Sequence, residues 1–281
     1  MPFTFSLAEY GKYVSRVGAA TYIDMSRRTD LACIPQLWQS LDQVVAEYGS
    51  PWVLQLWTKD PAGVICQGAD MLTRLRQAGT TITVQLTVTG LAGSIWEPLV
   101  PADAIQVVPE LAQLVGGVDH VCWRYDPIIP GAHRKATFES LAQRMASYGL
   151  QRGVINFIAP PGRYKRVDRR LGVLLPGWLE GMPGYDPAWC EATARELVAI
   201  ATPLGIRLAC CAEGSRLAGL VPGLAGAASG DYAWFCSLSG RQPPPHTGPG
   251  SRPGCGCAPY YDIGSYGHWT RCHRCVYCYA G

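Results

Sequence analysis

The last eleven residues of the chain, RCHRCVYCYAG, contain three cysteines that are separated by two residues each. Thiolates at this spacing, Cys272, Cys275 and Cys278, can fold around one metal centre, and two-residue gaps are typical of iron–sulfur ligand runs. Zinc is the main alternative cofactor, since four-thiolate zinc sites also use closely spaced cysteines. Three thiolates favour a 4Fe–4S cluster with one open iron, because structural zinc takes four ligands.

Twelve cysteines are many for a chain whose N-terminus, MPFTFSLAEYGKYVSRVG, lacks the features of a secretory signal. We therefore expect a cytoplasmic protein, in which disulfides are rare and clustered thiols bind metals or do chemistry. No apolar run approaches the length of about 18 residues that a membrane span needs. Five cysteines stand alone or in apolar surroundings and are predicted to be small buried hydrophobic residues: Cys33, Cys66, Cys122, Cys190 and Cys210.

Charged side chains form a second candidate site, because they follow short apolar runs along the chain. Those predicted to gather at one site are Arg27, Arg28, Asp30, Lys59, Asp60, Arg124, Asp126, Lys165 and Glu213. Arginine suits carboxylate and phosphate groups, so the site would take an anionic or nucleotide-like small molecule. The alternative is an ion-pair network that ties loops together. Trp57 and Trp123 directly precede these polar clusters and are expected to line the pocket.

The elements that must position these residues alternate regularly. Strands are predicted at 21–25, 52–57, 81–88, 119–123, 153–158 and 206–211, and helices at 34–48, 69–77, 104–115, 135–149 and 187–202. Strand–helix units of this length predict parallel strands with helical crossovers. Polar clusters after nearly every strand favour a TIM-like (β/α) barrel or partial barrel of about six strands over an open doubly wound sheet.

The alternation ends near residue 237. We predict a barrel-like domain at 1–236, a linker at 237–254 and a cysteine-rich tail at 255–281 that docks on the barrel mouth. Prolines and glycines crowd the linker, and a tail this short needs metal bonds and a surface to dock on. The net charge of +3 is weak support for nucleic-acid binding, which usually needs a more concentrated basic face.

The terminal motif CHRCVYCYA resembles the cluster-binding motif of radical SAM enzymes, and its YCYA ending resembles the photoproduct-lyase-like branch. The resemblance implies a 4Fe–4S cluster whose open iron binds S-adenosylmethionine, with Tyr277 near the adenine. The first gap departs from that motif, since it has two residues where three are usual.

The whole chain is similar to an uncharacterised bacterial family, a domain of unknown function whose C-terminal cysteines have been likened to the radical SAM motif. The similarity rests on SRRTD, LWTKDP, LTVTG, WRYDPI, CAE, CGC, DIGSY and CVYCYA. It implies a barrel-like fold and an iron–sulfur cluster, and it implies no particular reaction.

The remaining cysteines of these motifs form a second group, Cys211, Cys236, Cys255 and Cys257. Four thiolates could close a second cluster or a zinc site and pin the tail to the barrel. One cluster that draws on both groups is the alternative. Asp262 and Tyr266, in DIGSY, are expected to orient the cluster loop or to cap a turn. His273 is expected to face solvent or to support a metal ligand from behind.

Three functions follow from these observations. The first is a radical-SAM-like or other iron–sulfur enzyme that acts on a small or nucleotide-like substrate and draws on an external electron donor. The second is a nucleic-acid-binding or repair-associated protein with structural iron–sulfur or zinc sites. The third is a non-redox lyase or hydrolase that uses an open cluster iron as a Lewis acid.

Overall fold

The computed structural model describes residues 3–175, 177–178, 186–211, 214–226, 229–243 and 256–280. Two predicted site residues, Glu213 and Cys255, lie outside the described residues, and so does the larger part of the predicted linker. The linker is described as far as Pro243, and its first residues belong to a helix that ends at Ser239.

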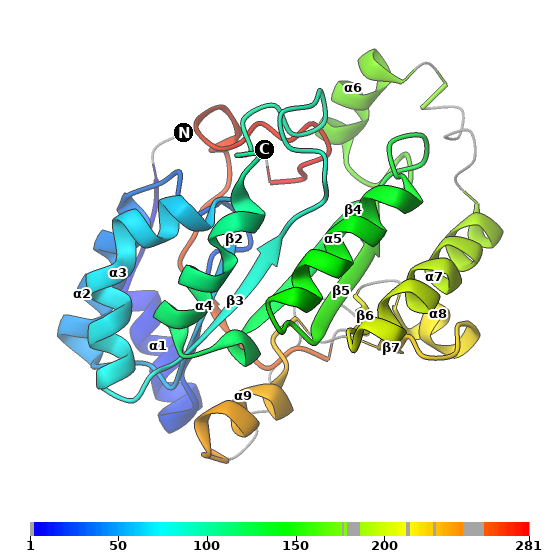
Figure 1. Cartoon of the computed structure of the whole chain (residues 1–281). Coiled ribbons are helices and arrows are strands. Elements are labelled where there is room, and N and C mark those ends of the chain that lie inside the picture. The colour runs from blue at the N-terminus through cyan, green and yellow to red at the C-terminus, as the bar shows by residue number, and fades with distance from the viewer. Residues whose placement is uncertain are drawn as a thin grey trace.

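All six predicted strands are present in one parallel sheet, which also contains two strands of two residues each, later in the chain (Figure 1). The strands are β1 (Tyr22–Met25), β2 (Val53–Thr58), β3 (Thr81–Thr87), β4 (Val121–Ile128), β5 (Arg152–Phe157), β6 (Arg207–Cys210), β7 (Ala225–Gly226) and β8 (Tyr261–Asp262). Their order, β7-β6-β5-β4-β3-β2-β1-β8, is the circular order of a (β/α) barrel that is opened between β7 and β8. The predicted parallel α/β architecture, a partial barrel, is confirmed.

Residues alternate between the two faces of each strand, as the period of two requires. Outward residues such as Ile23, Leu54 and Val84 belong to the large core beneath the helices. Inward residues such as Asp24, Gln55 and Gln85 are also fully buried, although they are polar. The interior of the barrel is therefore a hydrogen-bonded polar site, because buried polar groups must find partners inside the protein.

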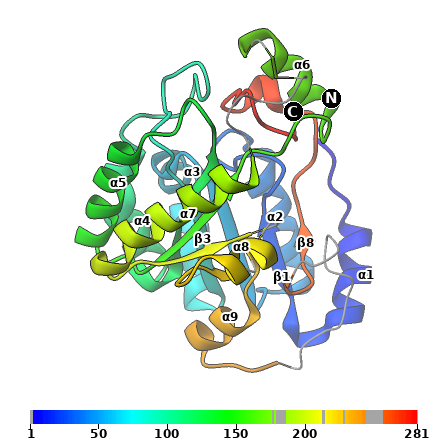
Figure 2. The same ribbon diagram turned by 90° about the vertical axis from the view of Figure 1, so that its right-hand side faces the viewer.

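Most of the described helices cover the outside of the sheet, and two lie at the ends of the barrel (Figures 1 and 2). They are α1 (Leu7–Val17), α2 (Gln36–Tyr48), α3 (Pro61–Gln77), α4 (Val108–Val115), α5 (Lys135–Ser147), α6 (Lys165–Leu174), α7 (Pro187–Ala201), α8 (Gly214–Leu220) and α9 (Tyr232–Ser239). Helices α3 and α7 begin with Asp-Pro, in which the Asp60 or Asp186 carboxylate accepts a hydrogen bond from the first turn. The sequence prediction missed α1, α6, α8 and α9.

The two ends of the barrel carry different segments. Helix α9 lies at the end where the strands begin, where Trp52 Nε1 donates to Ser239 Oγ at 3.2 Å and Trp234 Nε1 donates to the Asp119 carbonyl at 3.0 Å. The C-terminal tail, 256–280, reaches the opposite end and lies beside α6 (Figure 2). Within the described residues, no helix has both the length and the apolar character required to cross a membrane.

Candidate functional site

The tail lies on the carboxyl ends of β1 to β3, where active sites of such barrels are built. Strand β8 pairs with β1 through Ile23 and Asp24. After β8 the tail crosses the β1–α2 loop, where Thr29 Oγ1 donates to the Ser265 carbonyl at 3.0 Å. Gly264 is required at this crossing, because a Cβ there would lie 1.7 Å from Ser26 Oγ.

Asp30 is the central acceptor between the barrel and the tail. One carboxylate oxygen accepts from Thr58 Oγ1 at 2.9 Å, and the other accepts from the Lys59 amide at 2.6 Å and from His273 Nε2 at 2.9 Å. Burial raises the pKa of Asp30, but its contacts with His273 and the Lys59 amide outweigh this and leave the pKa below its usual value. His273 is buried and does not face solvent, so the first of its two predicted roles is wrong.

His273 and two thiols form the group most able to hold a single metal ion among the described residues. The ligand atoms of Cys33, Cys272 and His273 all lie within 4.8 Å of one another. A hydrogen bond from Cys33 lowers the pKa of Cys272 to about 7. Burial lowers the pKa of His273, but Asp30 more than offsets this and brings it to about 9. Both ring nitrogens of His273 are occupied, since Nδ1 lies 3.2 Å from the Leu99 carbonyl.

A second contact between barrel and tail joins Lys59, Glu97 and Tyr277. Lys59 Nζ lies 2.8 Å from Glu97 Oε1, and the Tyr277 hydroxyl donates to the same oxygen. Thr89 Oγ1 donates to the other Glu97 oxygen at 2.9 Å. Burial raises the pKa of Glu97, but Lys59 and the two hydroxyl donors lower it by more than burial raises it. The net pKa lies below the usual value, so the carboxylate stays charged. Glu97 was not predicted from the sequence.

Cys275 and Cys278 lie beside these cationic groups. Burial raises the pKa of Cys275 to about 12, while the positive charge of Lys59 lowers it. Burial also raises the pKa of Cys278, and the charges of Arg170 and Lys59 oppose that rise. Cys278 N donates to the Cys275 carbonyl at 3.1 Å, and Cys278 interacts electrostatically with Cys272 and Cys275, so the three residues lie close together. Among the described residues, Cys272 belongs to the group that could hold a single ion, and Cys275 and Cys278 do not.

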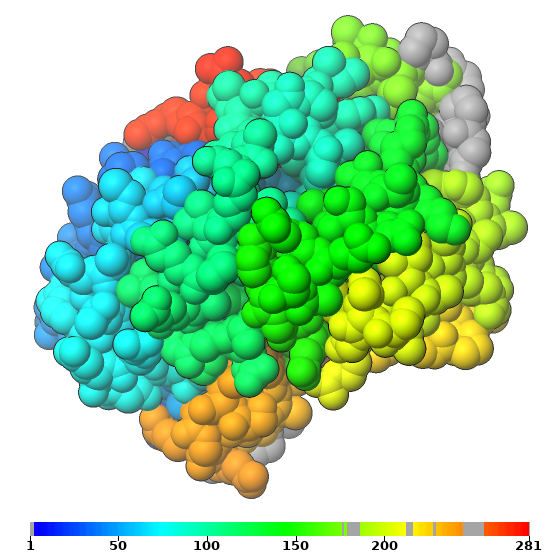
Figure 3. Space-filling model, viewed as in Figure 1, coloured from blue at the N-terminus to red at the C-terminus, as the bar shows by residue number. Residues whose placement is uncertain are grey.

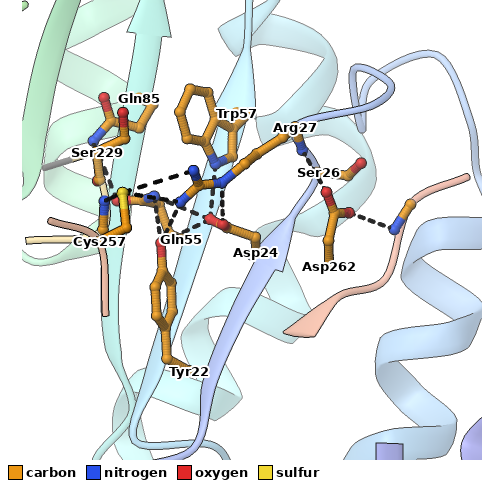
Figure 4. A network of polar contacts seen from close by, with 12 residues as sticks. Tyr22, Asp24, Ser26, Arg27, Gln55, Trp57, Gln85, Ser229, Cys257 and Asp262 are labelled. Atoms are coloured by element: carbon orange, nitrogen blue, oxygen red, sulfur yellow. Dashed lines mark hydrogen bonds and ion pairs between the residues drawn. The ribbon is translucent and has the colours of Figure 1, made fainter. Parts of the chain in front are cut away.

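Beneath the tail, the inner face of the barrel carries a network around Asp24 (Figure 4). One Asp24 oxygen accepts from Trp57 Nε1 at 2.8 Å and from Gln55 Nε2 at 3.0 Å, and the other pairs with Arg27. Gln55 also donates to the Tyr22 hydroxyl at 2.7 Å. These contacts compensate the cost of burying Asp24, which is fully enclosed.

Arg124 extends the network to β4. Its Nη2 lies 2.5 Å from Asp126 Oδ2, and its Nη1 donates to Gln85 and to Ser229 Oγ, each at 3.3 Å. The guanidinium groups of Arg27 and Arg124 each lie 5.0 Å from the Trp57 ring centroid. Trp57 therefore faces the barrel interior, as predicted. Trp123 stacks on Phe138 of α5 and does not line this site.

Arg28 binds the tail rather than the interior. It donates to the Gly264 carbonyl at 3.0 Å and lies 3.5 Å from Asp262, whose carboxylate also accepts from the Arg27 amide. Burial, followed by the negative charge of Asp24, raises the pKa of Asp262 to about 6. Tyr266 packs against the Arg28 guanidinium at 4.8 Å from its ring centroid.

The second cysteine group is only partly brought together. Gly230 N donates to Cys257 Sγ at 3.3 Å, and the neighbouring Ser229 Oγ lies 3.4 Å from Cys211 Sγ. Cys236 lies on α9, at the other end of the barrel. Within the described residues these three thiols do not form a single-ion group. A four-thiolate site that includes Cys255 stays a prediction.

Two of the five cysteines that were predicted to be small buried hydrophobic residues differ from that prediction. Cys122, Cys190 and Cys210 are buried, as predicted. Cys66 is exposed on α3, and Cys33 is only partly buried, with its Sγ 3.6 Å from His273 Nε2. Both therefore depart from the expected small apolar role. Of the remaining charged residues, Asp60 caps α3 and Lys165 is an exposed residue at the start of α6.

The sequence model of a domain of unknown function, DUF1848, matches residues 35–280, which is most of the chain. No curated protein matches significantly. One similar solved structure is a protein from Labrenzia alexandrii DFL-11, described as a mandelate racemase/muconate lactonizing enzyme, with 12% identity and a TM-score of 0.30 over 76% of this chain. The chain spans 58% of that protein's length, and a structural similarity this weak does not indicate a shared function.

Proposed function

The chain belongs to the DUF1848 family, and we propose that it is an iron–sulfur enzyme whose terminal thiolates hold a 4Fe–4S cluster above the barrel mouth. The observation that carries this proposal is the position of the triplet. Cys272, Cys275 and Cys278 lie in a stretch that His273 and Tyr277 attach to the loops at the carboxyl ends of the strands. Beneath this stretch lies a buried network of charged and amide side chains. This is where a partial barrel presents its catalytic groups.

The surrounding residues suit such a cluster. Three thiolates and the sulfides of a cluster form an anionic group, and Lys59 and Arg170 supply positive charge beside Cys275 and Cys278. Charges beside a cluster tune its reduction potential, and the positive charge of Lys59 lies next to Cys275. The donor set therefore fits a cluster with three cysteine ligands and one iron that the triplet leaves open.

The cofactor and the anionic end of the substrate would be held by the mouth residues. When S-adenosylmethionine is bound, the reduced cluster would supply the electron for its cleavage. The Tyr277 ring is fixed by its bond to Glu97, which suits a residue that contacts the adenine. The guanidinium groups of Arg27 and Arg124 each lie 5.0 Å from the Trp57 ring centroid. A carboxylate or phosphate of the substrate would bind them in competition with their present partners, Asp24 and Asp126.

The test is anaerobic purification followed by iron, sulfide and zinc analysis. We expect brown protein whose visible absorption bleaches with dithionite. Adding S-adenosylmethionine should change the electron paramagnetic resonance spectrum of the reduced protein and release 5′-deoxyadenosine slowly. Cys278→Ala should abolish both effects, whereas Cys66→Ala, at an exposed thiol on α3, should change neither. Colourless protein with stoichiometric zinc would contradict the cluster, and a spectrum that ignores saturating S-adenosylmethionine would contradict the radical SAM chemistry.

The group Cys33, Cys272 and His273 supports a second candidate function, a lyase or hydrolase that uses one zinc or iron ion as a Lewis acid. Asp30 would then orient His273 from behind, as carboxylates do at histidine metal ligands. The imidazole would first have to give up one of its two present hydrogen bonds. Metal analysis of the variants Cys33→Ala and Cys275→Ala distinguishes the single-ion site from the cluster. Metal lost only in Cys33→Ala would favour the single ion, and metal lost only in Cys275→Ala would favour the cluster.

A further inference from the structure

Three segments that are distant in sequence meet at the barrel mouth. They are the loop 91–100, the segment 160–175 that includes α6, and the tail 256–280, and together we call them the mouth rim (Figure 3). Val276 N donates to the Trp96 carbonyl at 3.1 Å, and Arg170 Nε donates to the Val276 carbonyl at 2.9 Å. The Tyr164 and Tyr279 rings stack with their centroids 5.4 Å apart. The rim is therefore one packed surface.

The mouth rim concentrates positive charge. Seven basic and three acidic residues give it a net charge of +4, whereas the other 17 basic and 18 acidic residues leave the rest of the chain at −1. The three acidic side chains, on Glu97, Asp168 and Asp262, are all buried. Every exposed charged side chain of the rim is therefore cationic. The exposed residues are Arg163, Lys165, Arg166, Arg169, Arg271 and Arg274.

The same surface exposes apolar side chains. Seven large hydrophobic residues are exposed among the described residues, and five of them lie on the rim: Ile95, Leu99, Val173, Tyr266 and Tyr279. Val173 is 83% exposed and Ile95 is 61% exposed. Arginine, tyrosine and aliphatic groups without exposed carboxylates are the composition of a protein–protein interface.

We propose that the mouth rim docks an acidic protein and, resting on the proposed function, that this partner is the electron carrier that reduces the cluster. The exposed aliphatic side chains favour a protein over a nucleic acid, because phosphates and sugars gain little from contact with Val173 or Ile95. Arg170 donates to the backbone carbonyl of Cys278, so a partner on the rim lies directly beside the triplet. In each transfer, one electron leaves the reduced flavin or iron–sulfur group of the carrier and enters the oxidised cluster.

The test measures binding of purified flavodoxin, an acidic flavin protein, to the full chain by calorimetry at low and high salt. We expect an affinity that falls steeply with salt, because opposite surface charges dominate the encounter. The double substitution Lys165→Glu with Arg169→Glu should weaken binding at least about tenfold. The matched control, Arg74→Glu with Arg144→Glu, makes the same change of charge on exposed residues of α3 and α5 and should leave binding unchanged.

Three results would overturn the docking surface. The first is that flavodoxin does not bind, and the second is that both double variants weaken its binding equally. The third is that a single-stranded oligonucleotide displaces flavodoxin at a lower concentration than flavodoxin itself needs, and that the Lys165→Glu, Arg169→Glu variant no longer binds the oligonucleotide. Circular dichroism melting of both variants checks that they are folded. Iron content is measured on the same samples, so protein that binds flavodoxin but contains no iron would refute the cluster and leave the docking surface standing.

Discussion

The interior of the barrel and the C-terminal tail arrange their charges in different ways. Inside the barrel, the ion pairs Asp24–Arg27 and Asp126–Arg124 are linked through glutamine and tyrosine side chains. In the tail, the described regular structure is the two-residue β8 and one short helical turn at Trp269–Arg271. The barrel therefore completes its own polar contacts, whereas the tail, under the proposed function, presents its thiols to a bound metal centre. We infer that the barrel folds without metal and that the tail becomes ordered only when metal is bound.

The most extensive effect, on the ordering of the whole tail, should come from removing the proposed metal ligands. In the triple variant Cys272→Ala, Cys275→Ala and Cys278→Ala, we expect trypsin to cut after Arg271 and Arg274 at least about tenfold faster, because metal bonds supply folding free energy to such short segments. The far-ultraviolet melting transition of the barrel should stay nearly the same. Cys66→Ala is the control, and equal protection of the tail in both variants would contradict a role for metal in ordering it.

The next effect concerns the interior. Asp24→Asn should lower the free energy of unfolding by about 3–4 kcal/mol, because it leaves the buried Arg27 without its counter-charge. Urea unfolding measures this loss, and the exposed Asp42→Asn should change it little. Iron content should stay at the wild-type level. Loss of iron in Asp24→Asn would show that interior and tail form one unit and would remove the contrast between them.

Much of the barrel could be predicted from the sequence, because strand and helix periods are local signals. All six predicted strands formed, and the end of the sheet at which the charged residues gather followed from parallel strands. The inward polar residues Asp24, Gln55 and Gln85 each interrupt the apolar run of their own strand. The prediction did not include this signal of a polar barrel interior. Sequence could not show the pairing of Glu97 with Lys59 or of Cys33 with Cys272, since these contacts join loops far apart in the chain.

Short elements were missed for a related reason. Ser6 directly precedes α1 and Asp231 directly precedes α9, and the side chain of each accepts a hydrogen bond from the first turn of its helix. These are recognisable start signals, but both helices lie outside the strand–helix alternation that guided the prediction. Helix α6 has no such cap and follows a loop rich in proline and glycine. Its packing against Trp96 and the tail stabilises it, and this contact is not visible in its own sequence.

A pH effect should appear where the interior meets the tail, at Asp262. Its pKa is raised to about 6, so the protonated form is favoured in the folded state. Stability from this group is fully present below about pH 4 and is lost as the pH rises to about 6, a change of about 3 kcal/mol. The unfolding free energy of the wild type minus that of Asp262→Asn should therefore fall as the pH rises from about 4 to about 6. A difference that rises instead would mean that Arg28 and the Arg27 amide outweigh burial.

The smallest effect should separate the attachment of the tail from metal binding. Tyr277→Phe removes the hydroxyl that donates to Glu97 but keeps the ring and leaves Lys59 paired with that carboxylate. One lost hydrogen bond to a charged acceptor that keeps another partner costs about 1 kcal/mol, so the fraction of molecules with an open tail should rise roughly fivefold. Hydrogen exchange of the tail amides measures this fraction.

Tyr279→Phe is the matched control for that change. Its hydroxyl donates to the Arg27 carbonyl at 3.3 Å from a more exposed position, so water can replace the bond at little cost. Iron content should be unchanged in both variants, because neither alters a thiol. If Tyr277→Phe instead loses iron, the Glu97 contact positions the cysteines themselves. The barrel would then order the metal site through its loops, and the tail would depend less on metal than the contrast between the two regions implies.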